Sequence, residues 1–407
     1  MTARAVLGQI GLALTALFIA GALVLPYNGG FVLAYALMAL TLVLTLSLLI
    51  VRARWRIGPA GWCLIAAFAL IATAFTIDGD APLMVNFIFL LAFIPLSTWL
   101  ARHAAPDSAG VASFVALAGS GLTLVTALAD VFYWKAPRAE GWWSDPIWSA
   151  EAALVLGFLA LMALPIMRSR WRYLLLLGPL FGLGAVVLSG SGGPLVAAPA
   201  IVLVLMLTTF RPWWKQIAGL VAMAVIAVAA MLPLAPAVMS RVDRTGAVLF
   251  ELVTTGTTNE PSVAPRLAFW QAGIAAFTHR PLTGYGWSKR VRSAYEYLPD
   301  KGAAFDANFS GLQGNHHLHA DILDMGVAGG VMGLAAYGLI LLAPLLGALR
   351  SVRDSQYTAR LTGALVLVTG YFVCGLTYLM FGYEFHTTLY VCLAAIVLGF
   401  CRDARPA

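Results

Sequence analysis

The chain has 407 residues, of which 61% are hydrophobic and 11% are charged; its formal net charge is +7 and its mean hydropathy is +0.87. A soluble globular domain carries about 25% charged residues, so this composition excludes that class. Apolar runs of roughly 20 residues, long enough to cross a hydrocarbon core of about 30 Å as helices, recur from end to end. The alternating short segments of a membrane β-barrel do not occur. We therefore predict an all-α, polytopic membrane protein.

The apolar runs predict twelve membrane spans. Nine fall within residues 1–235, a polar segment follows over residues 236–319, and three more fall within residues 320–407. The middle segment is too polar to cross a bilayer, so we expect one large loop that contains short helices. The spans are expected at about 5–25, 31–51, 57–77, 82–101, 111–132, 148–167, 173–189, 194–210, 216–235, 320–346, 361–380 and 387–401.

Basic residues predict the orientation of these spans. They concentrate in one set of loops and near the termini, whereas the opposite short loops hold only Lys135 and Arg138. The positive-inside rule then places both termini in the cytoplasm and the segment 236–319 on the outer face. Most of the excess basic residues are therefore expected to lie beside lipid headgroups, where they orient the helices. We predict no nucleic-acid partner. The four cysteines fall singly along the chain, so neither a disulfide nor a structural zinc site is expected.

One helix is predicted within the large loop. Pro265 suits its first position, and Leu267, Trp270, Ile274 and Phe277 follow at spacings of three and four, which predicts an apolar stripe lying along the membrane surface. Arg266 falls in the first turn, beside the free N–H groups and the positive end of the helix dipole. Such a position suits a phosphate group. The alternative is an interfacial arginine that contacts lipid headgroups.

A tight turn is expected directly after this helix, over residues 280–287. The sequence Arg-Pro-Leu-Thr-Gly-Tyr-Gly-Trp contains one proline and two glycines, Gly284 and Gly286. These residues favour an irregular turn whose backbone N–H groups can face a ligand. No strand and helix frame the two glycines, so we reject a nucleotide-binding fingerprint.

The densest group of titratable residues comes at the end of the loop, in the sequence GNHHLHADILDMG. It contains His316, His317 and His319, followed by Asp321 and Asp324. Ionisable groups at the edge of a membrane helix are functional candidates. If the helix starts by residue 316, His317 and both aspartates share one face, and His319 points elsewhere. Two alternatives stay open, a metal site built from His-x-His and an aspartate, and histidines satisfied at an interface.

Three motifs in this order resemble the O-antigen ligase and polymerase superfamily of bacterial envelope glycosyltransferases. They are Arg-x-x-x-Trp at Arg266 and Trp270, Pro-x-x-Gly-x-Gly from Pro281, and His319 followed after ten residues by Gly330 and then Gly333. The resemblance implies a GT-C-like enzyme of the bacterial inner membrane with its site facing the periplasm. It implies His319 as general base, because His319 alone matches the family spacing. His317, with its carboxylate partners nearby in the sequence, is the second candidate.

The resemblance also implies the substrates. They are an undecaprenyl-diphosphate-linked glycan as donor, a lipid A-core acceptor and surrounding membrane lipid, with inverting transfer and no nucleotide sugar, metal or other cofactor. Asp321 is expected to orient a histidine, and Arg266 and Trp270 to bind substrate. An O-antigen polymerase is the main alternative, and a protein O-glycosylating ligase comes third. A secondary transporter is disfavoured because charged residues are nearly missing from the middles of the spans.

The sequence departs from the family at one hairpin. Family members commonly have Ser-Arg-Gly there, whereas residues 189–193 read Ser-Gly-Ser-Gly-Gly, without the arginine. We expect another cation to bind the phosphates, with Arg241, Arg244, Arg290 and Arg292 as candidates. A smaller departure is Ala320, where the family usually has a polar residue.

Overall fold

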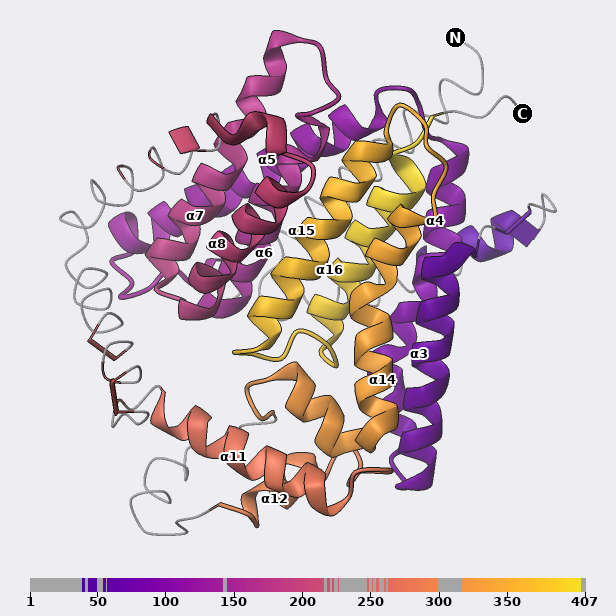
Figure 1. Cartoon of the computed structure of the whole chain (residues 1–407), viewed down its shortest axis with the longest axis vertical. Coiled ribbons are helices and arrows are strands. Elements are labelled where there is room, and N and C mark those ends of the chain that lie inside the picture. The colour runs from indigo at the N-terminus through magenta and orange to yellow at the C-terminus, as the bar shows by residue number, and fades with distance from the viewer. Residues whose placement is uncertain are drawn as a thin grey trace.

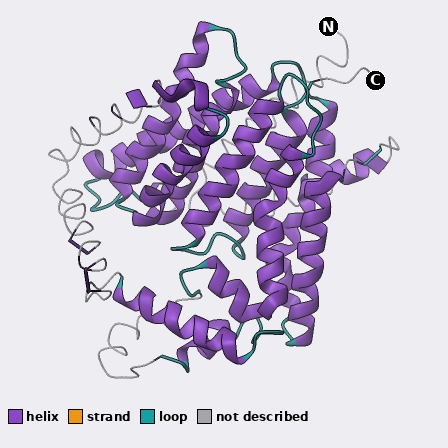
Figure 2. Ribbon diagram, in the orientation of Figure 1, coloured by secondary structure: helices purple, strands orange, loops and turns teal. Residues whose placement is uncertain are grey.

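The computed structural model describes residues 39–40, 43–49, 54–55, 57–141, 145–215, 263–298 and 317–403, with ten isolated positions between 218 and 260. Within these ranges every regular element is a helix, and no strand occurs (Figure 2). The α-helices are α3 (Gly58–Ile77), α4 (Phe93–Arg102), α5 (Ser108–Leu128), α6 (Pro146–Leu159), α7 (Leu177–Ser189), α8 (Gly192–Leu207), α11 (Ala264–His279), α12 (Arg290–Tyr295), α14 (Asp321–Leu349), α15 (Tyr357–Gly375) and α16 (Glu384–Ala395).

Seven helical segments of the described ranges are long and apolar enough to cross a membrane, and α8 and α16 add two shorter apolar helices. Several segments combine an α-helix with a tighter or wider neighbour, such as the 3₁₀ segment η1 (Ala81–Ala92) before α4. The all-helical membrane class is therefore confirmed. The expected spans 5–25, 31–51 and 216–235 lie wholly or largely outside the described residues, so the count of twelve stays a prediction, as do the loop's side of the membrane and the divisions at 235 and 319.

Helix α14 organises the bundle. It is 29 residues long and runs beside α3 (Figure 1). Its path bends at Gly330, whose φ of 58° and ψ of −143° are not helical. The bend releases backbone groups that the turn 281–286 then binds: Tyr285 N–H donates to Val327 O at 2.9 Å, and Val331 N–H donates to Pro281 O at 2.7 Å.

The glycines of the turn are required by this close approach. Gly284 and Gly330 both have positive φ, and a Cβ at Gly284 would lie 2.5 Å from the carbonyl oxygen of Ala328. Gly286 N–H donates to that same oxygen at 2.9 Å. The expectation that the N–H groups of this turn face a ligand is therefore wrong for Tyr285 and Gly286, because α14 accepts both hydrogen bonds.

Helices α11 and α12, the turn between them and residues 317–320 gather at the end of the bundle where α14 begins (Figure 1); we call this group the histidine lobe. A small apolar cluster, including Phe269, Ala272, Leu318 and Val327, joins the lobe to α14. The predicted helix after Pro265 is confirmed. The face that packs against the protein contains Phe269, which is 2% exposed, whereas Ile274 of the predicted stripe is 56% exposed. Contact of this stripe with the membrane surface stays a prediction.

Helix α6 is enclosed by the bundle, with every residue from Ser149 to Leu159 buried. It contacts α7 through glycines: a Cβ at Gly157 would lie 2.6 Å from the carbonyl oxygen of Gly178. Small residues at such contacts let helix backbones approach closely in membranes, where the hydrophobic effect does not drive helices together. The packing of α6 against α7 fixes the position of the start of α6. Asp145 and Trp148 lie there and contact the candidate site.

Candidate active site

The histidines precede α14 and are not part of it. The helix begins at Asp321, and His319 has a φ of 57°, a left-handed conformation that a helix cannot continue through. The hypothesis that His317 shares a helical face with Asp321 and Asp324 is therefore wrong. His319 N–H instead donates to Nδ1 of His317 at 3.2 Å, and the two rings meet edge to face with centroids 4.2 Å apart.

Asp324 holds this segment in place from the first turn of α14. Its carboxylate is fully buried; one oxygen accepts from Leu318 N–H at 2.8 Å, and the other pairs with Nε of Arg290 at 2.5 Å. The Arg290 guanidinium also lies 3.7 Å from the ring centroid of Trp287. These contacts favour a positioning role for Arg290, one of the cations expected to bind substrate.

Asp321 is also fully buried, and its carboxylate turns to a different segment. Oδ1 accepts hydrogen bonds from the N–H groups of Met380 at 2.8 Å and Phe381 at 3.1 Å. The residue thus anchors the loop between α15 and α16 to the start of α14. Asp321 was expected to orient a histidine. Its carboxylate instead binds the loop that carries Tyr378 and Tyr383.

Aromatic rings from this loop enclose the histidines. The ring centroids of Tyr378 and Tyr383 lie 4.7 Å and 6.0 Å from that of His317, and Tyr378 lies 6.1 Å from His319. Phe269 of α11 contributes a further ring, 6.5 Å from His319. His317 is 5% exposed, whereas His319 is less completely buried. His319 is therefore the histidine that a ligand reaches more easily.

The charge of Arg266 acts on His319. Burial, and then the positive charge of Arg266, lower the pKa of His319 to about 4, so the imidazole is neutral at pH 7. Neither Asp321 nor Asp324 is among the causes of this shift in the pKa. Burial also lowers the pKa of Arg266. The salt bridges of the described residues join Arg290 to Asp324, Arg360 to Asp354 and His386 to Glu151, and Arg266 takes part in none of them.

Tyr378 connects the histidines to α6. Its hydroxyl accepts from Nε1 of Trp148 at 3.2 Å and donates to Oδ2 of Asp145 at 3.5 Å. Asp145 also caps α6, accepting from Ile147 N–H at 2.7 Å. Burial raises the pKa of Tyr378, so its hydroxyl stays protonated. The sequence offered no motif for these three residues, because the loops that carry them are far apart along the chain.

The hairpin that lacks the family's arginine receives one from another loop. Nε of Arg138 donates to the carbonyl oxygen of Ser189 at 2.7 Å, and Nη2 lies 3.4 Å from Oγ of Ser191. Ser191 Oγ in turn donates to the carbonyl oxygen of Pro146 at 3.0 Å, next to Asp145. Arg138 was not among the expected cations, since only the fold brings the two loops together.

The remaining candidates lie apart from this cluster or outside the described residues. Trp270 is half-buried on α11, and its indole nitrogen is buried without a hydrogen-bond partner among the described residues. Arg292 is exposed on α12. Arg241, Arg244 and His316 lie outside the described residues. The substrate-binding roles of Arg241, Arg244, Arg290, Arg292 and Trp270 stay predictions.

Another buried pair lies deeper in the bundle. Nε2 of His386 is 3.2 Å from Oε2 of Glu151, and both side chains are at most 1% exposed. Trp148 contacts the His386 ring with centroids 5.4 Å apart. In the part of the chain that the structure describes, no three His, Cys, Asp or Glu side chains are grouped as a metal site would require.

Residues 177–338 match the family model described as O-Antigen ligase. No curated protein matches the chain. The match covers α7, α8, α11, α12 and the first part of α14, and so includes Arg266, His317 and His319. The matched segment is therefore similar to the family that the motifs predicted, and it contains all three of those motifs. The family implies a glycosyltransferase-like enzyme of a bacterial membrane that uses lipid-linked glycans.

Proposed function

We propose, from the O-antigen ligase family domain of residues 177–338, that this protein is an O-antigen ligase. It transfers a polysaccharide from undecaprenyl diphosphate to the lipid A-core oligosaccharide at the periplasmic face of the inner membrane. The observation that carries the proposal is the pairing of a neutral, partly accessible His319 with the nearby cation Arg266. Transfer from a diphosphate carrier needs both a base and a cation.

His319 acts as the general base. A sugar hydroxyl of the acceptor attacks the anomeric carbon of the donor, the bond from this carbon to the diphosphate oxygen breaks, and the hydroxyl proton moves to the imidazole. The imidazole is neutral before the step, as a base must be. Binding of the negatively charged donor raises the pKa of His319 towards neutrality and so makes it a stronger base. No metal takes part in this scheme.

Arg266 stabilises the departing diphosphate. Its planar guanidinium can bind two phosphate oxygens at once, which an ammonium group cannot do. The side chain is half-buried at the start of α11, whose first-turn N–H groups and dipole add positive potential. Partial dehydration strengthens this attraction.

Arg138 supplies the second cation, in place of the arginine missing from the hairpin. Its bonds to Ser189 and Ser191 hold the guanidinium at the start of α8. Replacement by glutamine is expected to raise the KM for the carrier-linked donor about tenfold, since a hydrogen bond to a charged group is worth about 1.5–3 kcal/mol. The melting temperature should fall only slightly, because the carbonyl oxygen of Ser189 loses one hydrogen-bond donor. Lys135→Gln, an exposed change in the same loop, is the matched control.

The banding pattern of lipopolysaccharide from a deletion strain tests the ligase proposal. Loss of a ligase leaves lipid A-core without any O-antigen while carrier-linked polymer accumulates. Core that carries a single repeat unit would instead identify an O-antigen polymerase, the second candidate within the same family. Unchanged lipopolysaccharide together with loss of a glycoprotein would identify a protein O-glycosylating ligase.

A further inference from the structure

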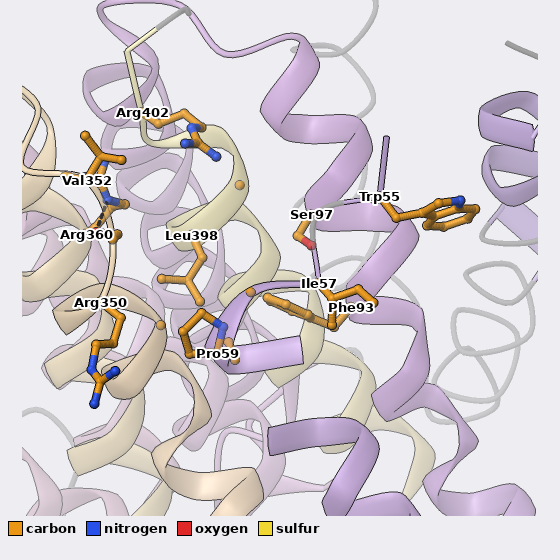
Figure 3. A pocket seen from close by; sticks show the side chains of 15 residues that line it. Trp55, Ile57, Pro59, Phe93, Ser97, Arg350, Val352, Arg360, Leu398 and Arg402 are labelled. Carbon is orange, nitrogen blue, oxygen red and sulfur yellow. Dashed lines mark hydrogen bonds between the residues drawn. The ribbon is translucent and has the colours of Figure 1, made fainter. Parts of the chain in front are cut away.

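Two of the three ion pairs found in the described residues have evident structural tasks. Arg290 and Asp324 hold the segment that carries the histidines. Arg360 lines a cavity beside the end of α14 (Figure 3). It pairs with Asp354 at 2.8 Å and donates to the carbonyl oxygen of Cys401 at 2.8 Å, and so joins the end of the last helix to the loop after α14. The third pair needs another explanation.

Glu151 of α6 and His386 of α16 form this third pair. Nε2 of His386 lies 3.2 Å from Oε2 of Glu151, and both side chains are at most 1% exposed. Neither Nε2 nor the two carboxylate oxygens have another hydrogen-bond partner among the described residues. Both residues lie in apolar helical segments, where ionisable groups are costly and mark functional sites. Stability does not explain the pair, since apolar side chains of similar volume often replace such pairs without loss.

The pair lies beside Trp148. Glu151 follows Trp148 by three residues on α6, so the two side chains are neighbours on one face of the helix. The ring of His386 meets that of Trp148 edge to face, with centroids 5.4 Å apart, and Phe385 stacks on the same indole at 5.7 Å. The backbone of His386 is fixed as well, because its carbonyl oxygen accepts from the Tyr371 hydroxyl at 3.2 Å. The orientation of the indole therefore depends on the imidazole that Glu151 holds.

Trp148 connects the pair to the candidate active site. Its Nε1–H donates to the Tyr378 hydroxyl at 3.2 Å, and the ring of Tyr383 lies 5.9 Å from its own. Both tyrosines contact the ring of His317, which contacts His319 in turn. A rotation of the indole would therefore move the two tyrosines that enclose the histidines.

We propose that Glu151 and His386 are positioning residues: they fix Trp148 and, through it, the tyrosines that hold His319 in place. The role of His319 itself rests on the proposed function. A single proton, on the carboxyl or on the imidazole, gives one donor that faces one acceptor, and hence a contact with a defined direction. An apolar pair would fill the same volume but would not fix the angle of the indole.

Two substitutions of Glu151 separate positioning from stability. Glu151→Gln keeps a hydrogen-bonding group towards His386, whereas Glu151→Leu keeps only the volume and is better suited to an apolar helix. We expect kcat of the full-length Gln protein within about twofold of the parent and that of the Leu protein about tenfold lower, although the Leu protein melts at the same or a higher temperature. Leu156→Ala, a buried change elsewhere on α6, should lower the melting temperature without lowering kcat.

A second measurement does not depend on transfer. The pKa of His319 is about 4 chiefly because the ring is buried. NMR of protein labelled at its histidines, assigned with His319→Gln, follows this pKa. In Glu151→Leu it should rise towards the ordinary 6.5 as water reaches the ring, and in Glu151→Gln it should stay at about 4. The groups that face His319 are Arg266 from α11, His317 and Tyr378, and both variants leave them unchanged.

Any of three results would overturn the proposal: parental kcat in Glu151→Leu, a Gln protein as slow as the Leu protein, or a pKa of His319 that stays at about 4 in the Leu protein. If the single Leu variant fails to fold, Glu151→Leu/His386→Phe gives the same comparison without an unpaired imidazole. If the parent itself transferred no glycan, the proposed function would be wrong, whereas the pKa of His319 would still decide whether the pair positions the histidines.

Discussion

Helices α11 and α12 both belong to the histidine lobe, and each carries an arginine that the sequence predicts to bind substrate. On α12, Arg290 is 5% exposed, pairs with the buried carboxylate of Asp324 and lies against Trp287. On α11, Arg266 is half-buried, takes part in none of the salt bridges found in the described residues, and acts electrostatically on His319.

The difference shows how one residue type serves two purposes in the same lobe. The charge of Arg290 is neutralised inside the protein by Asp324. The carboxylate of Asp324 also accepts a hydrogen bond from Leu318 and so holds the segment that carries the histidines. Arg266 has no such salt bridge among the described residues, although the negative charge of Glu260 acts on it, and we propose that its guanidinium binds the ligand. Burial alone does not distinguish these roles, because both side chains are partly or wholly enclosed. They are distinguished by what each guanidinium contacts, since Arg290 pairs with Asp324 whereas Arg266 acts on His319.

The largest effect is expected where the α12 pair is broken. Asp324→Asn should destabilise the folded protein by about 3–5 kcal/mol, because it leaves Arg290 buried without a counter-charge. The apolar double variant Arg290→Met/Asp324→Leu should recover part of the loss, because it removes the unpaired charge but leaves the Leu318 N–H without its acceptor. Thermal unfolding in detergent measures both, with Arg292→Met on the same helix as the exposed control. An Asp324→Asn protein as stable as the parent would refute the positioning role.

A smaller but specific loss is expected at the histidines that the pair positions. His319→Ala should reduce transfer about 10²-fold or more, as for a lost general base. His317→Ala should lie between this value and the parent, and His316→Ala should lose little. Rates are measured with purified protein and a carrier-linked donor at matched expression. If His319→Ala transfers at the parental rate while His317→Ala is inactive, the assignment of the base is wrong.

A conservative change on α11 distinguishes its arginine from that of α12. Arg266→Lys should slow transfer about tenfold without lowering the melting temperature, because an ammonium group keeps the charge but loses the bidentate geometry. Arg292→Lys serves as the control. Parental activity in the Arg266→Lys protein would instead indicate an arginine that binds lipid headgroups.

The smallest effect is expected in the pH profile of kcat/KM. The pKa of His319 is about 4, so the basic form is complete at pH 7 and kcat/KM should stay constant down to about pH 5 before it falls. Arg266→Gln should move this acid limb to higher pH, since loss of the neighbouring positive charge raises the pKa of His319. If the fall of kcat/KM at low pH occurs at the same pH in the Arg266→Gln protein, then Arg266 does not act on the group whose titration causes it. His317 and Tyr378 also face His319 and are unchanged in this variant.

Much of this protein follows from local sequence. The lengths of the apolar runs predicted the described spans to within a few residues, because each helix must satisfy its own backbone inside a bilayer. The proline before Arg266 marked the start of α11. The spacing from His319 to Gly330 and Gly333 predicted the family, and the bend at Gly330 now gives this spacing a physical reason, since the turn from Pro281 binds there.

Contacts between distant segments were decided by the tertiary structure alone. Arg138 reaches the hairpin at Ser189, and Tyr378 reaches His317, across separations of 51 and 61 residues along the chain. No local periodicity encodes such pairs, because they depend on how the helices pack. The sequence by itself determined where helices form and which polar residues are costly to bury. Packing decided which of those residues neutralise one another, as Arg290 and Asp324 do, and which charge acts on a neighbouring histidine, as that of Arg266 does on His319.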